Sequence, residues 1–411
     1  MVSYETFSKH LINNSTLRSR TFKSFLKNAR VLSSNKTIVP LEQYLQNKII
    51  KLEDLKLIYL HICEREEYLK RFYKRSLEIP ENIHITHPPM PASHLDNDKQ
   101  VNYKNVIRNM FWLEILKKTK SGFSNILSFL DVLENLYKEE IIDYKLLTPS
   151  AIQYIRDGRI GSVFSSFYFR ASIMNPYLVY SLAKSVLYKN KRFHEFFGTK
   201  VEGKIKVFTP TLGWGSYFYG FAETGALYSY TGVDVIPSVC KKTFLFAKEN
   251  YPDVFTQMIC SPSEDLLENP NFIKIHREQY NIVFFSPPYF QLEIYEGKMQ
   301  STNRYKTYEE WLLNYWEKTV QLCHLVLEKN GIMCYILSGY GSEKVRDDKL
   351  IFGSGDSSAK IRPGDSKNLI KDMNNITKKY FTFVKMYNMY NKNVHSTKHA
   401  ETNEKIILFY K

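Results

Sequence analysis

Short apolar runs alternate with longer amphipathic stretches through the second half of the chain. Seven runs are predicted to form strands: Ile205–Phe208, Tyr230–Val235, Phe255–Cys260, Ile282–Phe285, Ile332–Leu337, Phe381–Met386 and Lys405–Tyr410. Helical patterns lie between them over Ser216–Glu223, Pro237–Asn250, Tyr308–Glu328 and Ser366–Lys378. This alternation is typical of a doubly wound, Rossmann-like α/β sheet. Because no clear helix separates the last two runs, we expect them to pair as an antiparallel hairpin at one edge.

Residues 1–150 have a different pattern, which predicts a helical domain. Apolar residues recur at helical spacing through Leu52–Leu77, and two more such stretches lie within 103–140 and are broken near Ser121-Gly122. A loop rich in Pro, His and Asp, His84–Gln100, precedes those two stretches. A length of 411 residues favours two domains. We therefore expect a helical domain over 1–150 and the α/β domain over 151–411.

The net charge of the chain indicates what kind of partner it binds. The chain carries a formal net charge of +15, and residues 1–50 and 151–200 each hold eight Lys or Arg against two acidic residues. A polyanion is the simplest partner for such a chain, which favours a nucleic acid. The basic helical region, the basic stretch 184–206 and the Gly/Ser/Lys-rich loop 339–367 are the candidate contacts.

Cysteine usage and hydropathy narrow the setting. The five cysteines are scattered and form no C-x-x-C pair, which argues against a disulfide framework and a zinc site, so no metal is expected. No run of about 18 apolar residues suggests a membrane span. The first ten residues lack the apolar core of a secretory signal. An intracellular protein is the expectation.

The first strand of the α/β region leads into a candidate cofactor loop. Gly213 and Gly215 stand where the chain turns from strand to helix, and glycines there let the backbone approach a ligand closely. Asp234 ends the next strand, at the spacing of an acid that holds both hydroxyls of a ribose. The hydroxyls of Thr209 and Thr211 precede the glycines. This pattern indicates a nucleoside cofactor and leaves NAD and S-adenosylmethionine both open.

Two acidic residues follow the third strand. Glu264 or Asp265 would meet the adenine amine of such a cofactor, or both would serve as acids at the start of a helix. These two interpretations stay equally open at the level of sequence.

The fourth strand ends in the tetrapeptide Ser286-Pro287-Pro288-Tyr289. An exocyclic amine of a nucleobase is a weak nucleophile, because its lone pair is delocalised into the ring. Acceptors for its N–H bonds, here the Ser286 side chain and the Pro287 carbonyl, localise that lone pair. The prolines hold those acceptors in place, and Tyr289 offers a ring on which an extruded base can stack.

Taken together, these motifs resemble those of the S-adenosylmethionine-dependent DNA amino-methyltransferases, which modify cytosine-N4 or adenine-N6. The resemblance covers roughly residues 165–411, and within this family the chain is similar to viral and phage enzymes. It implies a seven-stranded methyltransferase sheet and an S-adenosylmethionine cofactor whose methionine end is enclosed by Asn175 and Pro176. It also implies that Arg304 contacts a DNA phosphate or orders the loop over the base, although a surface arginine at a helix entry is at least an equal alternative.

The expected function is therefore methyl transfer to the exocyclic amine of a base flipped from duplex DNA. Serine at position 286 favours cytosine-N4 over adenine-N6. Two alternatives remain. One is an RNA amino-methyltransferase, since the same tetrapeptide can hold an amine in RNA. The other is a nucleic-acid-binding relative without activity, motivated by Thr209 and Thr211 standing where the family has a carboxylate. The oligomeric state does not follow from the sequence.

Overall fold

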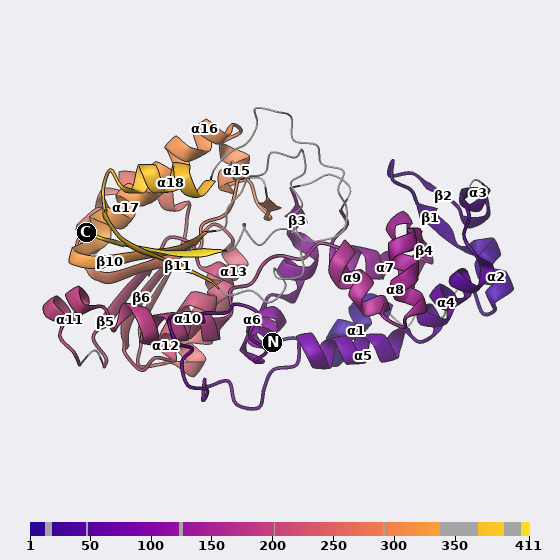
Figure 1. Cartoon of the computed structure of the whole chain (residues 1–411), viewed down its shortest axis with the longest axis horizontal. Helices are drawn as coiled ribbons and strands as arrows, with labels where there is room; N and C mark the ends of the chain where they lie inside the picture. The colour runs from indigo at the N-terminus through magenta and orange to yellow at the C-terminus, as the bar shows by residue number, and fades with distance from the viewer. Residues whose placement is uncertain are drawn as a thin grey trace.

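Seven strands form one mixed sheet at the centre of the larger lobe (Figure 1). The computed structural model describes residues 1–12, 19–46, 48–122, 126–200, 202–290, 292–337, 369–389 and 404–411. The sheet order is β11-β12-β10-β8-β5-β6-β7, and β12 alone runs antiparallel to its neighbours. The strands are β5 (Ile205–Thr209), β6 (Leu227–Asp234), β7 (Phe255–Cys260), β8 (Tyr280–Phe285), β10 (Leu327–Leu337), β11 (Thr382–Asn388) and β12 (Lys405–Tyr410).

The predicted α/β class with an N-terminal helical region is confirmed, and each apolar run lies in a strand. β8 is buried along its whole length, as expected for a central strand covered on both faces. β11 and β12 pair antiparallel as predicted. Asn330-Gly331, a residue pair typical of a sharp turn, lies inside β10, where Asn330 takes a φ of 68° and the register shifts.

Helices cover both faces of the sheet. In Figure 1, α17 (Lys318–Val326) and α18 (Leu369–Thr377) lie above it, and α10 (Pro176–Leu182) and α12 (Ser216–Ala222) lie below. The remaining helices of this lobe are α11 (Lys191–Phe197), α13 (Pro237–Asn250), α14 (Pro270–His276), α15 (Ser301–Arg304) and α16 (Tyr308–Trp311). Gly220 allows α12 to pack on α10, because a Cβ there would lie 2.5 Å from Val179.

The helical lobe, on the right in Figure 1, contains more than helices. It holds α1 (Tyr4–Ile12), α2 (Phe22–Asn28), α3 (Leu41–Leu45), α4 (Leu52–Cys63), α5 (Arg65–Ser76), α7 (Phe129–Glu139), α8 (Pro149–Arg156) and α9 (Ile160–Phe167). A small sheet of order β2-β1-β4, formed by Ile38–Pro40, Arg30–Leu32 and Ile141–Asp143, was not predicted. Three-residue strands are too short to show a period. Within the described ranges, every helix is too short or too polar to pass through a lipid bilayer.

Two connections join the helical half to the sheet. α6 (Tyr103–Met110) lies beside α10, beneath the sheet in Figure 1. β3 (Lys120–Ser121) pairs antiparallel with β9 (Glu293–Ile294), which follows the tetrapeptide by a few residues. The segment that leaves the tetrapeptide is therefore anchored on the N-terminal half of the chain.

Candidate active site

A cavity opens at the carboxyl ends of β5, β6, β7 and β8, the edge where parallel α/β sheets bind ligands. Its volume of about 170 Å³ far exceeds the 10–15 Å³ or so that one water requires, so it can admit an organic ligand. The predicted site residues that line it are Thr211, Gly213, Asp234, Glu264, Ser286, Pro287, Pro288 and Tyr289. Four segments that are distant in sequence thus share one cavity.

The glycine loop has an unusual backbone. Gly213, Trp214 and Gly215 take φ values of 52°, 59° and 79° in succession, all in the left-handed region that favours glycine. A Cβ at Gly213 would lie 2.1 Å from the ring of Tyr217, so no larger residue fits without moving that ring. The Trp214 side chain is buried and its Nε1 donates to the Ser172 carbonyl at 3.1 Å. These contacts hold the loop in its left-handed course.

Tyr217 joins this loop to the tetrapeptide, a role that sequence reasoning missed. Its hydroxyl accepts the Ser286 N–H at 3.0 Å and lies 3.4 Å from the Ser286 carbonyl, to which it can donate. The Thr211 hydroxyl also donates to that carbonyl at 3.4 Å. Burial raises the pKa of the Tyr217 phenol, so it stays a neutral donor. The main chain of Ser286 is therefore fixed independently of its side chain.

Asp234 stands at the end of β6 and receives hydrogen bonds from the loop beside it. One carboxylate oxygen accepts the Ile236 N–H at 3.0 Å, and the other accepts the Leu212 N–H at 3.2 Å. Burial raises the pKa of Asp234 to about 6, while these backbone hydrogen bonds oppose the rise. The carboxylate is thus charged at neutral pH and faces the cavity.

We expect cofactor binding to weaken on acidification. An ionised Asp234 can accept both hydroxyls of a ribose, whereas a protonated one loses an acceptor. Since its folded pKa is about 6, affinity for S-adenosylhomocysteine should be constant above that pH. It should then fall as the pH drops below that value and level off near the affinity of the form with a protonated carboxyl. Calorimetric titration across this range tests the expectation, and Asp234→Asn should give a flat profile. Unchanged affinity in acid would contradict it.

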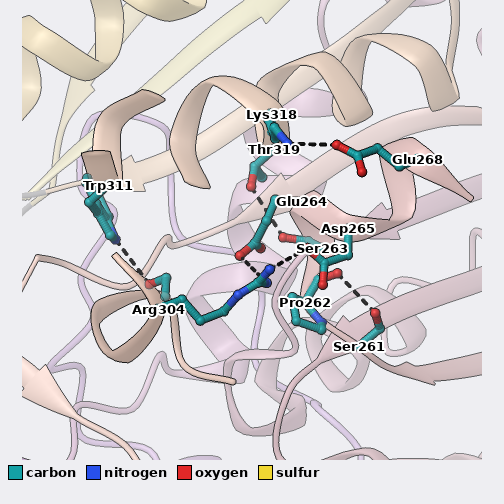
Figure 2. A network of polar contacts seen from close by, with 11 residues as sticks. Ser261, Pro262, Ser263, Glu264, Asp265, Glu268, Arg304, Trp311, Lys318 and Thr319 are labelled. Carbon is teal, nitrogen blue, oxygen red and sulfur yellow. Dashed lines mark hydrogen bonds and ion pairs between the residues drawn. The ribbon is translucent and has the colours of Figure 1, made fainter. Parts of the chain in front are cut away.

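Arg304 contacts two carboxylates at the edge of the cavity. Its guanidinium donates to Glu264 at 2.8 Å and to Asp265 at 2.7 Å, and Figure 2 shows the three side chains converging. Burial raises the pKa of Glu264, and the charge of Arg304 opposes that rise. Glu264 lines the cavity, and Asp265 is not among its lining residues. Arg304 thus clamps an acidic pair, which fits a role in ordering its own loop, and its contact to a DNA phosphate stays a prediction.

The segment carrying Arg304 forms part of the cavity wall. Met299, Gln300 and Ser301 line it. Trp311 Nε1 donates to the Ser301 hydroxyl at 3.1 Å, which ties the start of α15 to α16. The clamp and this bond hold the segment over Glu264.

Besides Asp265, four predicted cofactor residues are not among those that line the cavity: Asn175, Pro176, Thr209 and Gly215. Asn175 is fully buried and caps α10, where its side chain accepts the Tyr177 N–H. Pro176 begins that helix, and its carbonyl packs against Gly220. The Thr209 hydroxyl, also buried, is 2.7 Å from the Tyr230 hydroxyl. The wall is formed instead by Ser172, Ile173 and Met174, directly before Asn175. Gly215 is likewise not among the lining residues, since a Cβ there would meet Thr243 at 2.9 Å.

Glu293 and Asn97 are further wall residues that the sequence did not single out. Glu293 accepts the Ser172 N–H at 2.9 Å and the Tyr295 hydroxyl at 2.5 Å, so both of its oxygens are engaged. Asn97 accepts the Asn175 N–H at 2.7 Å, which fixes the N-terminal segment against the sheet lobe. The contacts of Glu293 with Ser172 and of Asn97 with Asn175 join residues more than 75 positions apart and leave no local pattern.

The wall is strongly acidic for so basic a chain. Four carboxyl groups line it, from Asp234, Glu264, Glu293 and Glu404, and no Lys or Arg is among the described lining residues. A phosphate group would meet repulsion there, whereas a cationic ligand would be attracted. This acidity favours a positively charged cofactor over a dinucleotide with a pyrophosphate.

The segments proposed to contact DNA differ in position. The stretch 184–206 includes α11, where Arg192 donates to Asn330 at 2.7 Å, near the start of β10. That is the amino-terminal edge of the sheet, opposite the cavity. The loop 339–367 lies outside the described residues, so its contact stays a prediction.

No protein-family model matches the chain, and no curated protein is significantly similar to it. Solved structures do resemble it at low scores. The [4+2]-cyclase SpnF is 10% identical over 51% of this chain and 76% of its own, with a TM-score of 0.34. The N-methyltransferase NodS from Bradyrhizobium japonicum, solved with S-adenosylhomocysteine, is 10% identical over 58% and 88%, at 0.31. A TehB-like SAM-dependent methyltransferase from Corynebacterium glutamicum is 10% identical over 56% and 92%, at 0.29.

Similarity at this level does not bear on substrate or activity. The chain's own sheet is informative, because its seven strands follow a methyltransferase-like order with the single reversed strand next to one edge. The chain therefore has a methyltransferase-like α/β fold with an N-terminal helical region.

Proposed function

We propose that this protein transfers a methyl group from S-adenosylmethionine to the exocyclic amine of a base flipped out of DNA, with cytosine-N4 favoured over adenine-N6. One observation carries the proposal: the cavity combines Asp234 and Glu264 with the tetrapeptide Ser286–Tyr289 on one edge of the sheet. An adenosyl group and a nucleobase can each find their partners there, close enough for a direct transfer.

The residues present fit the cofactor. Asp234 would hold the ribose hydroxyls, and Glu264, oriented by Arg304, would accept the adenine amine. S-adenosylmethionine carries a sulfonium and an ammonium, so a wall whose described residues include four carboxyl groups and neither Lys nor Arg suits it better than it suits NAD. When bound, the cofactor supplies an electrophilic methyl group. The residues of the chain then position the amine and need neither a metal nor a nucleophilic cysteine.

The tetrapeptide is suited to hold the amine. The Ser286 hydroxyl and Pro287 carbonyl would accept its two N–H bonds and turn its lone pair toward the methyl group. Because Tyr217 and Thr211 hold the main chain of Ser286, these acceptors need little reorganisation on binding. Most of the rate enhancement would come from this positioning.

Tyr289 is half-buried at the cavity and would stack on the flipped base. We expect Tyr289→Ala to raise the KM for DNA by roughly fivefold to a hundredfold, since stacking is worth about 1–3 kcal/mol per base. The Kd for the cofactor should not change. Tyr289→Phe keeps the ring and should behave as wild type, and Tyr228→Ala, an exposed tyrosine on β6, is the control. Equal activity in all three variants would contradict stacking.

The decisive experiment incubates purified protein with S-adenosylmethionine and DNA, and identifies the methylated nucleoside by mass spectrometry. N4-methylcytosine or N6-methyladenine in DNA supports the proposal. Parallel reactions with tRNA and ribosomal RNA test the RNA alternative, which the same tetrapeptide would allow. Methylation confined to RNA would refute DNA as the substrate and support the RNA alternative.

A further inference from the structure

Four carboxyl groups line the described part of the cavity wall, and that of Glu404 differs from the other three in having no hydrogen-bond partner there. Asp234 accepts backbone N–H groups, Glu264 is clamped by Arg304, and Glu293 has both oxygens engaged. Among the described residues, no hydrogen bond or ion pair involves the Glu404 side chain. Its main chain is fixed, since its carbonyl accepts the Met389 N–H at 3.0 Å. The carboxyl is thus built into the wall and available to a ligand.

The strand order puts Glu404 on the substrate side of the tetrapeptide. β8 lies two strands from β6, which carries Asp234, and two strands from β12 in the opposite direction. Glu404 immediately precedes β12, and its neighbour Lys405 pairs with Leu337 at the carboxyl end of β10. Two strand spacings amount to about 10 Å. By strand order, Ser286 therefore stands between Asp234 and Glu404, and both carboxyl groups line the same cavity.

The surroundings of Glu404 favour its neutral form. Burial raises its pKa to about 7, with Lys104 lowering it and Asp98 and Glu293 raising it. Lys104 is on α6, Asp98 lies in the preceding loop, and Glu293 is on β9. Lys104 itself donates to the Asn97 carbonyl at 3.0 Å and lies 3.7 Å from Asp98. A large fraction of Glu404 is therefore protonated near neutral pH and can donate a hydrogen bond.

The target base requires such a donor. In cytosine and adenine the exocyclic amine adjoins a ring nitrogen with a lone pair, and Ser286 and Pro287 offer acceptors to the amine. Several other N–H and O–H donors of the wall are engaged: Trp214 with Ser172, Tyr217 with Ser286, and Gln300 with Glu296. The Tyr315 hydroxyl also lines the wall and has no hydrogen-bond partner among the described residues, but the charges of Glu264 and Asp234 act on it, which puts it on the cofactor side. We propose that Glu404 donates a hydrogen bond to the ring nitrogen beside the target amine. The substrate class is then an amine flanked by an unprotonated ring nitrogen.

This inference rests on the proposed function. Its test removes the proposed hydrogen bond from each side in turn, once by substituting Glu404 and once by replacing the ring nitrogen of the base. Wild type and Glu404→Ala are each assayed on a duplex that the wild type methylates, and on the same duplex with the ring nitrogen replaced by CH. Each single change should lower kcat/KM by about tenfold to a hundredfold. The two together should lower it little further, because they remove the same hydrogen bond.

Protonation gives a second, independent readout. The KM of wild type for DNA should rise as the pH passes upward through about 7, because the ionised carboxyl no longer donates. Glu404→Gln keeps an N–H donor, so it should stay within about threefold of wild type near neutral pH and lose this pH dependence. Glu249→Gln, an exposed glutamate at the end of α13, is the matched control.

The outcomes separate the inference from the function on which it rests. The inference would be overturned if the losses from the two changes were additive. It would also be overturned if Glu404→Gln were as inactive as Glu404→Ala and the activity of wild type rose at high pH. In the second case Glu404 would instead accept the proton that the amine releases. In either case wild type still methylates DNA. If wild type methylates no DNA at all, the assay of wild type on the unmodified duplex is enough to refute the proposed function, and the inference fails with it.

Discussion

Ser286→Ala is expected to abolish most methyl transfer while leaving cofactor binding intact. The serine hydroxyl would accept an N–H of the amine most strongly as the amine gives up its lone pair, so its loss should act on kcat. Removal of one such preorganised group costs about a hundredfold to a thousandfold. Single-turnover transfer to DNA and calorimetric titration with S-adenosylhomocysteine measure the two quantities separately.

The fold should tolerate this change. The main-chain hydrogen bonds of Ser286 to Tyr217 and Thr211 do not involve the substituted side chain. The melting temperature of the variant should therefore match that of wild type and of Ser165→Ala, an exposed serine on α9. A variant that retains more than about half of kcat would refute the role assigned to the hydroxyl.

Asp234→Ala should have the largest effect on cofactor binding. The substitution removes two charge-assisted hydrogen bonds to the ribose, each worth about 1.5–3 kcal/mol. It also frees the Leu212 and Ile236 N–H groups that now hold the loop to β6. We expect the Kd for S-adenosylhomocysteine to rise by about a hundredfold or more.

Asp234→Asn should lose less, because the amide retains one oxygen acceptor. Asp253→Ala, an exposed position after α13, is the control for a surface carboxylate. Binding by wild type that disappears in Asp234→Ala would also exclude a relative that has lost its cofactor. Equal Kd values for wild type and Asp234→Ala would refute the assignment of an adenosyl-binding site to this edge of the sheet.

Much of the sheet follows from local patterns. Strands such as β8 are unbroken apolar runs, because a parallel strand is covered on both faces. β10 shows where this reasoning ends. Its first residues read as the end of a helix and a turn, yet they belong to the strand, with Asn330 left-handed and bonded to Arg192. That contact spans 138 positions and leaves no trace near Asn330.

The candidate site divides in the same way. Gly213, Asp234 and the tetrapeptide could be proposed from the sequence because each lies at or just after the end of a strand, and the ends of parallel strands meet at one edge. Asn175 and Pro176, proposed from the resemblance, cap and begin a buried helix and are not among the residues that line the cavity. The choice between Glu264 and Asp265 was open in the sequence, and the position of Arg304 places Glu264 in the cavity wall.

The sequence by itself determined which segments become strands and in what order a glycine loop, an acid and the Ser-Pro-Pro-Tyr turn leave them. Backbone periodicity and turn chemistry are local, so a few adjacent residues suffice to specify them. The tertiary structure alone decided that Arg304 meets two carboxylates, that Tyr217 supports Ser286, and that Glu404 enters the cavity. Those contacts depend on the order of strands across the sheet and on packing between distant segments, and neither is written in any short stretch of the chain.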